Sequence, residues 1–210
     1  MLETVRDRAR PYFEGAPPAH DWHHVRRVAA LADTLVAEQT EPVDERIVQL
    51  AVALHDIGRE REDRGQIDDH ATWGAREGSR ILADVGATEE TIERVRHCIH
   101  AHRYSNEIEP ETLEAEIVCD ADNLDALGAV GIARAFAHGS VIGSPLYDPD
   151  VPPAADETAD GRSQYNHFYK KILELPERMY TDAGRELAAD RATFVREYLE
   201  RFEAEASGDA

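Results

Sequence analysis

The stretch Leu50 to Gly58, LAVALHDIG, joins an apolar helical run to a His-Asp pair, His55 and Asp56. The run predicts a buried helix that ends at two adjacent side chains able to bind a metal ion, with Gly58 as the glycine of its C-cap. An imidazole and a carboxylate would then lie at the bottom of a pocket. Other segments contain side chains of the same chemistry, namely His24, His70, His102 and Asp122.

The hydrophobic pattern predicts helices along the whole chain and no convincing strand. The expected helices are Glu3–Phe13, about Asp21–Gln39, a helix from after Pro42 to His55 and Asp56, one that begins at His70, one from the turn GATEE to His102, Glu111 to about Leu127, the segment GAVGIARAFAHG, about Gln164–Leu175, and Asp182–Glu205. A polar connector is expected over 59–69. We therefore predict an all-α, single-domain bundle over 1–210, with its core at about 20–140. A proline- and acid-rich lid loop is expected over 143–162, and closing helices over 164–206.

The 210-residue chain is strongly acidic, with 43 Asp and Glu against 23 Lys and Arg, and Lys170 and Lys171 are its only lysines. Carboxylates dispersed along the chain predict a solvated acidic surface, as in a halophilic cytoplasm, in preference to an acidic patch for a basic partner. General nucleic-acid binding is disfavoured. Because no apolar run approaches the length of a membrane span, we expect a soluble cytoplasmic protein without a membrane partner. Cys98 and Cys119 lie in apolar patterns, which predicts buried free thiols.

The inward-facing acidic residues indicate a metal ion. Burying Asp56 and Asp122 as carboxylates costs several kcal/mol unless a cation offsets the charge. Together with the imidazoles of His24 and His55 they would form a mixed nitrogen and oxygen site. Such a site suits manganese, iron, cobalt, nickel or zinc better than calcium, and it leaves positions open for water and substrate.

Three motifs carry a resemblance to a known family: HDWHHVRRV, LHDIG and DADNLDALGAVGIARAF. They resemble the HD superfamily of metal-dependent phosphohydrolases, and within it a small single-domain group related to nucleotide pyrophosphatases. The segments HAHRYS, HFYKKIL and GRELAADR extend the resemblance over nearly the whole chain. It implies an HD-type helical bundle that hydrolyses a phosphomonoester, phosphodiester or pyrophosphate bond of a small phosphorylated substrate, with a nucleotide favoured. It also implies a divalent cofactor, for which we favour manganese over iron, cobalt, nickel, zinc or magnesium.

The resemblance assigns metal ligation to His24, His55, Asp56 and Asp122. His70 and His102 fall where HD phosphodiesterases with two metals have additional ligands; the alternative is that they line the pocket and contact phosphate or water. We expect one tightly held ion and at most a weak second one. The remaining histidines are expected on the surface or in the core, with His20 and His167 the nearest to the site: His20, His23, His97, His100, His138 and His167.

The expected mechanism is hydrolysis by a metal-activated water at Asp56 and its partners. Asp125 is a candidate general base or supporting carboxylate, with a helix cap or an arginine salt bridge as the alternative. Arg27, with Lys171 or Lys170, would neutralise phosphate charge. The alternative is that these cationic side chains are solvated at the protein surface and have no part in catalysis. Some HD nucleotidases have a catalytic glutamate soon after the His-Asp pair. Here Arg59 and Glu60 follow, so that role is not assigned.

Two other function classes are compatible with the sequence. A di-iron oxygenase on the same scaffold would need all six candidate ligands and would consume oxygen. A non-catalytic metal or nucleotide sensor would bind its ligand without turnover. A homodimer is kept as an alternative to a monomer.

Overall fold

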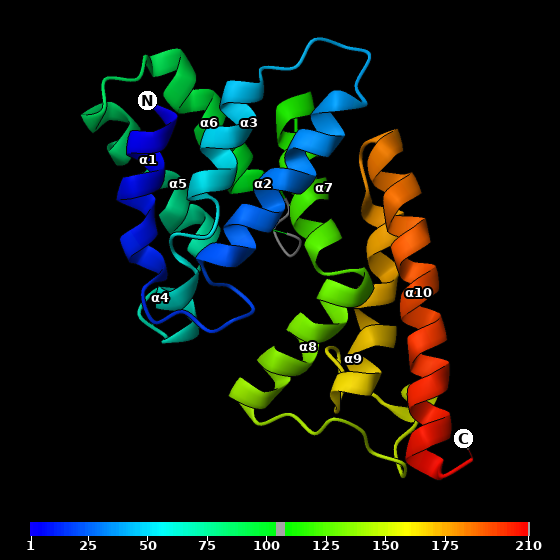
Figure 1. The fold of residues 1–210 in the computed structure, drawn as a ribbon. Coiled ribbons are helices and arrows are strands. Elements are labelled where there is room, and N and C mark those ends of the chain that lie inside the picture. The colour runs from blue at the N-terminus through cyan, green and yellow to red at the C-terminus, as the bar shows by residue number, and fades with distance from the viewer. Residues whose placement is uncertain (104–107, 210) are drawn as a thin grey trace. The chain divides into compact units, whose positions relative to one another are not determined.

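The computed structural model describes residues 1–103 and 108–209, and within these ranges every regular element is a helix (Figure 1). This confirms the all-α prediction. The chain forms two compact units, Met1–Asp122 and Asn123–Ala210, which are described in turn. That the chain acts as a single domain over 1–210 stays a prediction.

The central helix of the first unit is α3, Glu45–Leu54, the helix predicted from the apolar run. All its residues from Ile47 to Leu54 are buried. Asp44 caps its start by accepting a hydrogen bond from the Ile47 amide at 3.3 Å. Four helices pack against α3, which explains why a helix apolar on all sides is stable there: α1 (Leu2–Ala9), α2 (Trp22–Ala37), α5 (His70–Asp84) and α6 (Glu89–Ala101).

The predicted role of Gly58 as a C-cap glycine is wrong. His55 is the C-cap residue of α3, and Gly58, with φ −95°, precedes a further short helix, α4 (Arg59–Asp63). A Cβ at Gly58 would lie 2.8 Å from the carbonyl oxygen of His70 and 3.1 Å from the Trp73 ring. The glycine is therefore required by the close approach of α5, and not by a left-handed backbone.

In two other segments of this unit the structure differs from the prediction, and local chemistry explains both differences. The helix expected over Glu3–Phe13 is α1 followed by a 3₁₀ turn, η1 (Arg10–Phe13), where the ring of Pro11 cannot continue an α-helical hydrogen-bond pattern. The connector expected over 59–69 contains α4, which is supported by ion pairs four residues apart, Arg59 with Asp63 and Glu60 with Arg64.

Helices α5 and α6 pack closely, and small residues of α5 lie at their contact. A Cβ at Gly78 would lie 3.0 Å from Ile99 on α6 and 3.5 Å from Leu54 on α3. Cys98 and Cys119 are buried free thiols, as expected. The next helix, α7 (Leu113–Asp125), runs to the end of this unit and into the start of the next.

The second unit contains α8 (Gly128–Ile142), α9 (Gln164–Lys170) and α10 (Asp182–Ser207). The helix expected over Gln164–Leu175 ends as α-helix at Lys170, because the backbone of Lys171 leaves the helical region with φ −134°, and the chain continues as 3₁₀ turns, η3 (Ile172–Arg178), which contain Pro176. Aromatic rings contact one another in this unit around the buried Tyr165 and Phe168, and the others are Phe136, Tyr147, Tyr198 and Phe202.

The segment 143–162 is an ordered loop with one 3₁₀ turn, η2 (Pro153–Ala155). It is organised around Asp156, which is 4 % exposed. The Asp156 carboxylate accepts hydrogen bonds from the Arg162 amide, from Thr158 and from the Asn166 side chain. These bonds hold the pKa of Asp156 well below its usual value. A role for this loop as a lid stays a prediction.

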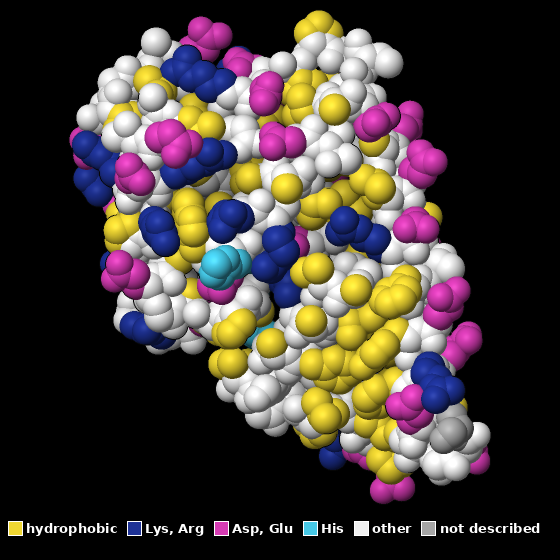
Figure 2. Space-filling model, in the orientation of Figure 1, with side chains coloured by type: hydrophobic (Ala, Val, Ile, Leu, Met, Phe, Trp, Pro, Cys, Tyr) yellow, Lys and Arg dark blue, Asp and Glu magenta, His cyan; other side chains and the backbone are white. Residues whose placement is uncertain are grey.

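Acidic side chains are dispersed over both units and interspersed with arginines, while hydrophobic side chains gather on one face of the second unit (Figure 2). The dispersion agrees with the expected acidic surface; a halophilic source stays a prediction. Among the described residues, no helix is long and apolar enough to cross a membrane.

Candidate metal centre

The predicted ligands are placed by the starts and ends of helices in the unit Met1–Asp122. His24 lies in the first turn of α2, where the Asp21 side chain accepts hydrogen bonds from the amides of His23 and His24. His55 and Asp56 follow α3. The remaining candidates are His70 at the start of α5, His102 after α6, and Asp122 in α7.

His24, His55 and Asp122 form one cluster. The Nε2 atoms of His24 and His55 are 3.2 Å apart, and Oδ1 of Asp122 lies 3.3 Å from the first and 3.8 Å from the second. Oδ2 of Asp56 faces the same point, at 3.6 Å from His24 and 3.7 Å from His55. The structure therefore brings together all four residues that were predicted to hold the metal ion.

His70 and His102 form a second cluster with the other oxygen of Asp56. Oδ1 of Asp56 lies 3.4 Å from Nε2 of His70 and 3.7 Å from Nε2 of His102, and these two nitrogens are 3.4 Å apart. Asp56 thus faces one cluster with each carboxylate oxygen. A bridging carboxylate is the arrangement that two-metal sites use.

The hydrogen bonds of the rings show that these residues fit a metal ion. Nδ1 of His55 donates to the Val52 carbonyl at 2.8 Å, and Nδ1 of His102 donates to the Ile99 carbonyl at 2.6 Å. Nδ1 of His70 donates to Glu62 at 2.7 Å. In the neutral rings Nε2 then carries a lone pair that points at the cluster. Lone pairs that converge within 3.4 Å in a buried site repel one another unless a cation lies between them, and a metal ion supplies that charge.

Burial and charge set the protonation of the cluster. Burial lowers the pKa of His55 to about 4. Burial alone would raise the pKa of Asp56, but the surrounding imidazoles, His55 first, hold it well below its usual value. Asp122 behaves in the same way, mainly through its hydrogen bond with His24. The neutral imidazole and the ionised carboxylates are the forms that bind a metal ion.

The second cluster differs in its protonation. Burial lowers the pKa of His70. Burial also acts to lower the pKa of His102, but the hydrogen bond to Asp56 and the charge of that residue outweigh it and raise the pKa above the usual value. A proton therefore competes with a metal ion at His102 more strongly than at His55.

Glu62 is a supporting residue that the sequence did not point to. Its Oε2 accepts hydrogen bonds from the His70 amide at 2.6 Å and from the His70 ring. Arg103 pairs with both oxygens of Glu62 and also with Asp69, the residue that caps α5. Glu62 lies in the segment expected to be a polar connector, so no spacing marked it. A carboxylate that orients a metal-binding histidine is a common supporting contact in metal sites.

The histidines outside the predicted ligand set lie in several places. His20 lies near the site, as anticipated, with its Nδ1 3.4 Å from Oδ2 of Asp56. His97 accepts from the Glu111 amide and His100 contacts Thr72, so both are used in local structure. In the second unit, His167 donates to the Asp160 carbonyl. Within the motif HAHRYS, positions 104 and 105 lie outside the described residues.

The predicted catalytic side chains outside the clusters have local partners. Asp125 forms an ion pair with Arg134 at 2.8 Å. An arginine salt bridge was one of the alternatives to a catalytic role for Asp125. Lys171 pairs with Asp160 at 3.3 Å. The ammonium group of Lys170 donates to the Asp156 carbonyl, and Arg27 is half-buried on α2. The roles of Asp125, Lys171 and Arg27 in catalysis stay predictions.

An all-helical fold with buried clusters of imidazoles around a shared carboxylate fits a class of helical proteins that bind divalent metal ions through histidine and aspartate. The HD domain family matches residues 21–127, which include His24, His55, Asp56 and Asp122. This chain belongs to the HD superfamily.

Relatives match the chain over its whole length. The YpgQ protein of Bacillus subtilis is 34% identical over 99% of this chain and 95% of its own length. The structure of YpgQ in complex with ADP covers all of both chains at 32% identity and a TM-score of 0.77. An HD-superfamily hydrolase from Bacillus thuringiensis has a TM-score of 0.75 at 32% identity, over 98% of this chain and 96% of its own.

Proposed function

We propose that this protein is a phosphohydrolase that uses a metal-activated water to cleave a phosphate ester or pyrophosphate bond of a nucleotide. The observation that carries the proposal is the geometry of Asp56, which faces His24, His55 and Asp122 with one oxygen and His70 and His102 with the other. The YpgQ structure with ADP supports a nucleotide as the substrate class.

His24, His55, Asp56 and Asp122 would hold the tight ion, and His70, His102 and Asp56 would hold a weaker second one. A divalent ion bound there lowers the pKa of its water and polarises a phosphoryl oxygen. The protein's own contribution is to orient the imidazoles, through hydrogen bonds from their Nδ1 atoms to the carbonyls of Val52 and Ile99 and to Glu62. We favour manganese, with iron, cobalt, nickel, zinc and magnesium as alternatives.

Cations are needed to neutralise the substrate phosphates. Arg27 and Lys171 are our candidates for this role, with Asp125 as a candidate base. In the unit that contains the clusters, Arg59 is a further candidate: burial alone would lower the pKa of Arg59, but the charges of Asp56 and Asp63 raise it, which places the guanidinium within the field of the site.

Metal analysis followed by a substrate screen tests this function. Purified protein is analysed for bound metal and then incubated with manganese in high salt, with nucleoside triphosphates, nucleoside monophosphates and cyclic dinucleotides as substrates. Release of pyrophosphate indicates a pyrophosphatase, release of orthophosphate a phosphatase, and a linear product without inorganic phosphate a phosphodiesterase.

Two adjacent histidines provide a matched control. His24 is buried in the cluster, whereas His23 is exposed on the same turn of α2. His24→Gln should lose metal and turnover, and His23→Gln should keep both. Bound iron with oxygen consumption would instead establish the oxygenase, and nucleotide binding without any product would establish the sensor.

A further inference from the structure

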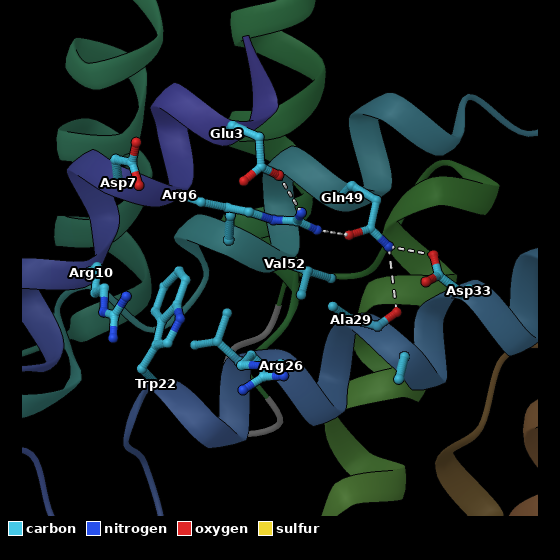
Figure 3. Close-up of a pocket in the computed structure, with 13 residues that line it drawn as sticks. Glu3, Arg6, Asp7, Arg10, Trp22, Arg26, Ala29, Asp33, Gln49 and Val52 are labelled. Carbon is cyan, nitrogen blue, oxygen red and sulfur yellow. Dashed lines mark hydrogen bonds and ion pairs between the residues drawn. The ribbon is translucent and has the colours of Figure 1, made fainter.

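Helices α1, α2 and α3 line a cavity of about 340 Å³ that contains none of the clustered histidines (Figure 3). On α2 the lining residues are Trp22, Val25, Arg26, Ala29, Ala30 and Asp33. Their spacing of three and four places them on one face of the helix. His24 lies two positions from both Trp22 and Arg26, and so points to a different side of α2. The cavity and the metal centre therefore use separate faces of this helix.

The deeper part of the cavity is apolar. Val25, Val52 and Ala53 line it and are each at most 3 % exposed. Trp22 forms a wall, and its ring is fixed by an edge contact with Phe13 at a centroid distance of 5.4 Å. An apolar floor beside a fixed indole suits a flat ring, and the volume lies at the lower end of the range for small-molecule sites.

One end of the cavity is closed by a network that satisfies its own charges. Arg6 pairs with Glu3 at 2.7 Å and donates to Gln49 at 2.9 Å. The Gln49 amide in turn donates to Asp33 at 2.6 Å. The residues of this network connect α1, α2 and α3 (Figure 3). Because their polar groups are paired with one another, the groups that could bind a ligand lie at the other end of the cavity.

At that other end, Arg10 and Arg26 extend on either side of Trp22 (Figure 3). Both are exposed, and neither has an ion-pair or hydrogen-bond partner for its side chain among the described residues. Most arginines of this acid-rich chain are paired with carboxylates. Outside the network, the charged residues that line the cavity are Arg10, Arg26 and Asp7, which are two cations and one anion. A guanidinium group binds phosphate or carboxylate through two parallel hydrogen bonds.

We propose that this cavity binds a small aromatic anion of the nucleoside monophosphate class. The ring lies against Trp22 and the apolar floor of Val25 and Val52, and the anionic group pairs with the guanidinium groups of Arg10 and Arg26, which extend beside Trp22. This site is separate from the metal centre, and the proposal does not depend on the proposed phosphohydrolase function.

The test uses the full chain with Asp56→Asn, which disables the metal centre, and with Trp73→Phe, which leaves Trp22 as the only tryptophan. Fluorescence of Trp22 is titrated with AMP, adenosine and inorganic phosphate in the presence of a chelator. AMP should give a saturable change, and adenosine or phosphate should bind at least tenfold more weakly. Arg10→Ala and Arg26→Ala should each weaken AMP binding about tenfold or more.

Arg76→Ala is the matched control, because Arg76 is also exposed and has no ion-pair partner among the described residues, but does not line this cavity. It should leave AMP binding unchanged, and circular dichroism should show that every variant is folded. The proposal is overturned if AMP gives no saturable change up to millimolar concentration. It is also overturned if Arg10→Ala and Arg26→Ala bind as the parent does, or if Arg76→Ala weakens binding equally.

Discussion

Glu62 holds His70 by two hydrogen bonds to the same carboxylate oxygen, one from the backbone amide at 2.6 Å and one from ring Nδ1 at 2.7 Å. His55 and His102 donate instead to backbone carbonyls. His70 is thus the one of these three rings that a side chain orients, and its orientation can be changed without touching a ligand.

Glu62→Gln should weaken metal binding at the second cluster about 10- to 100-fold, because the amide supports the His70 ring less well than the carboxylate does. Calorimetric titration with manganese measures the effect. Glu60→Gln is the control, since Glu60 lies on the same helix but pairs with Arg64, which is more exposed than Arg103, the partner of Glu62. Equal affinities in Glu62→Gln and the unchanged protein would show that Glu62 does not support a metal ligand.

Asp56→Asn should remove bound metal and turnover together, because Asp56 supplies the charge that both clusters share. The amide keeps the shape of the side chain, so circular dichroism should remain unchanged. Elemental analysis and the phosphate-release assay provide the two measurements. Full metal content with normal turnover in this variant would exclude Asp56 as a ligand.

His102→Ala should decide the number of ions. We expect the unchanged protein to bind one ion tightly and a second weakly, and the variant to keep the tight ion and lose the weak one. The titration should span micromolar to millimolar manganese, and bound ions should lie about 2.0 to 2.3 Å from their nitrogen and oxygen ligands. Two equally tight ions in the unchanged protein would contradict this expectation.

The affinity for the second ion should rise with pH, whereas His55, a ligand of the first ion, should release no proton near neutrality. His55, with a pKa of about 4, is already neutral at pH 6 to 7. The pKa of His102 is raised above its usual value, so below that pKa an ion must displace a proton and its affinity increases roughly tenfold per pH unit. Manganese titrations at several pH values measure both slopes. A flat profile for the second ion would show that no proton is displaced.

Gly58→Ala should destabilise the fold by about 1 to 3 kcal/mol, because its Cβ would lie 2.8 Å from the His70 carbonyl oxygen and would displace the start of α5. Gly74→Ala is the matched control, since its Cβ would make ordinary contacts at 3.4 Å or more. Thermal and urea unfolding measure the difference. If both variants unfold alike, the close approach at Gly58 is not important for stability.

The sequence by itself determined the helices and the ligand candidates. Helical periodicity and capping residues are local properties, so α3 and the cap at Asp44 could be predicted from the chain alone. His24, His55, Asp56 and Asp122 could be proposed because each lies on or next to an apolar stripe, and the motifs that contain them are specific to the family.

Only the tertiary structure decided which atoms face each other. The division of Asp56 between two clusters depends on the packing of α5 and α6 against α3, which no local pattern encodes. Glu62 was missed for the same reason, because its partner His70 is set by the path of the chain through α4. Gly58 was assigned the wrong role because a close backbone approach and a left-handed cap both require glycine, and the amino-acid type alone does not distinguish them.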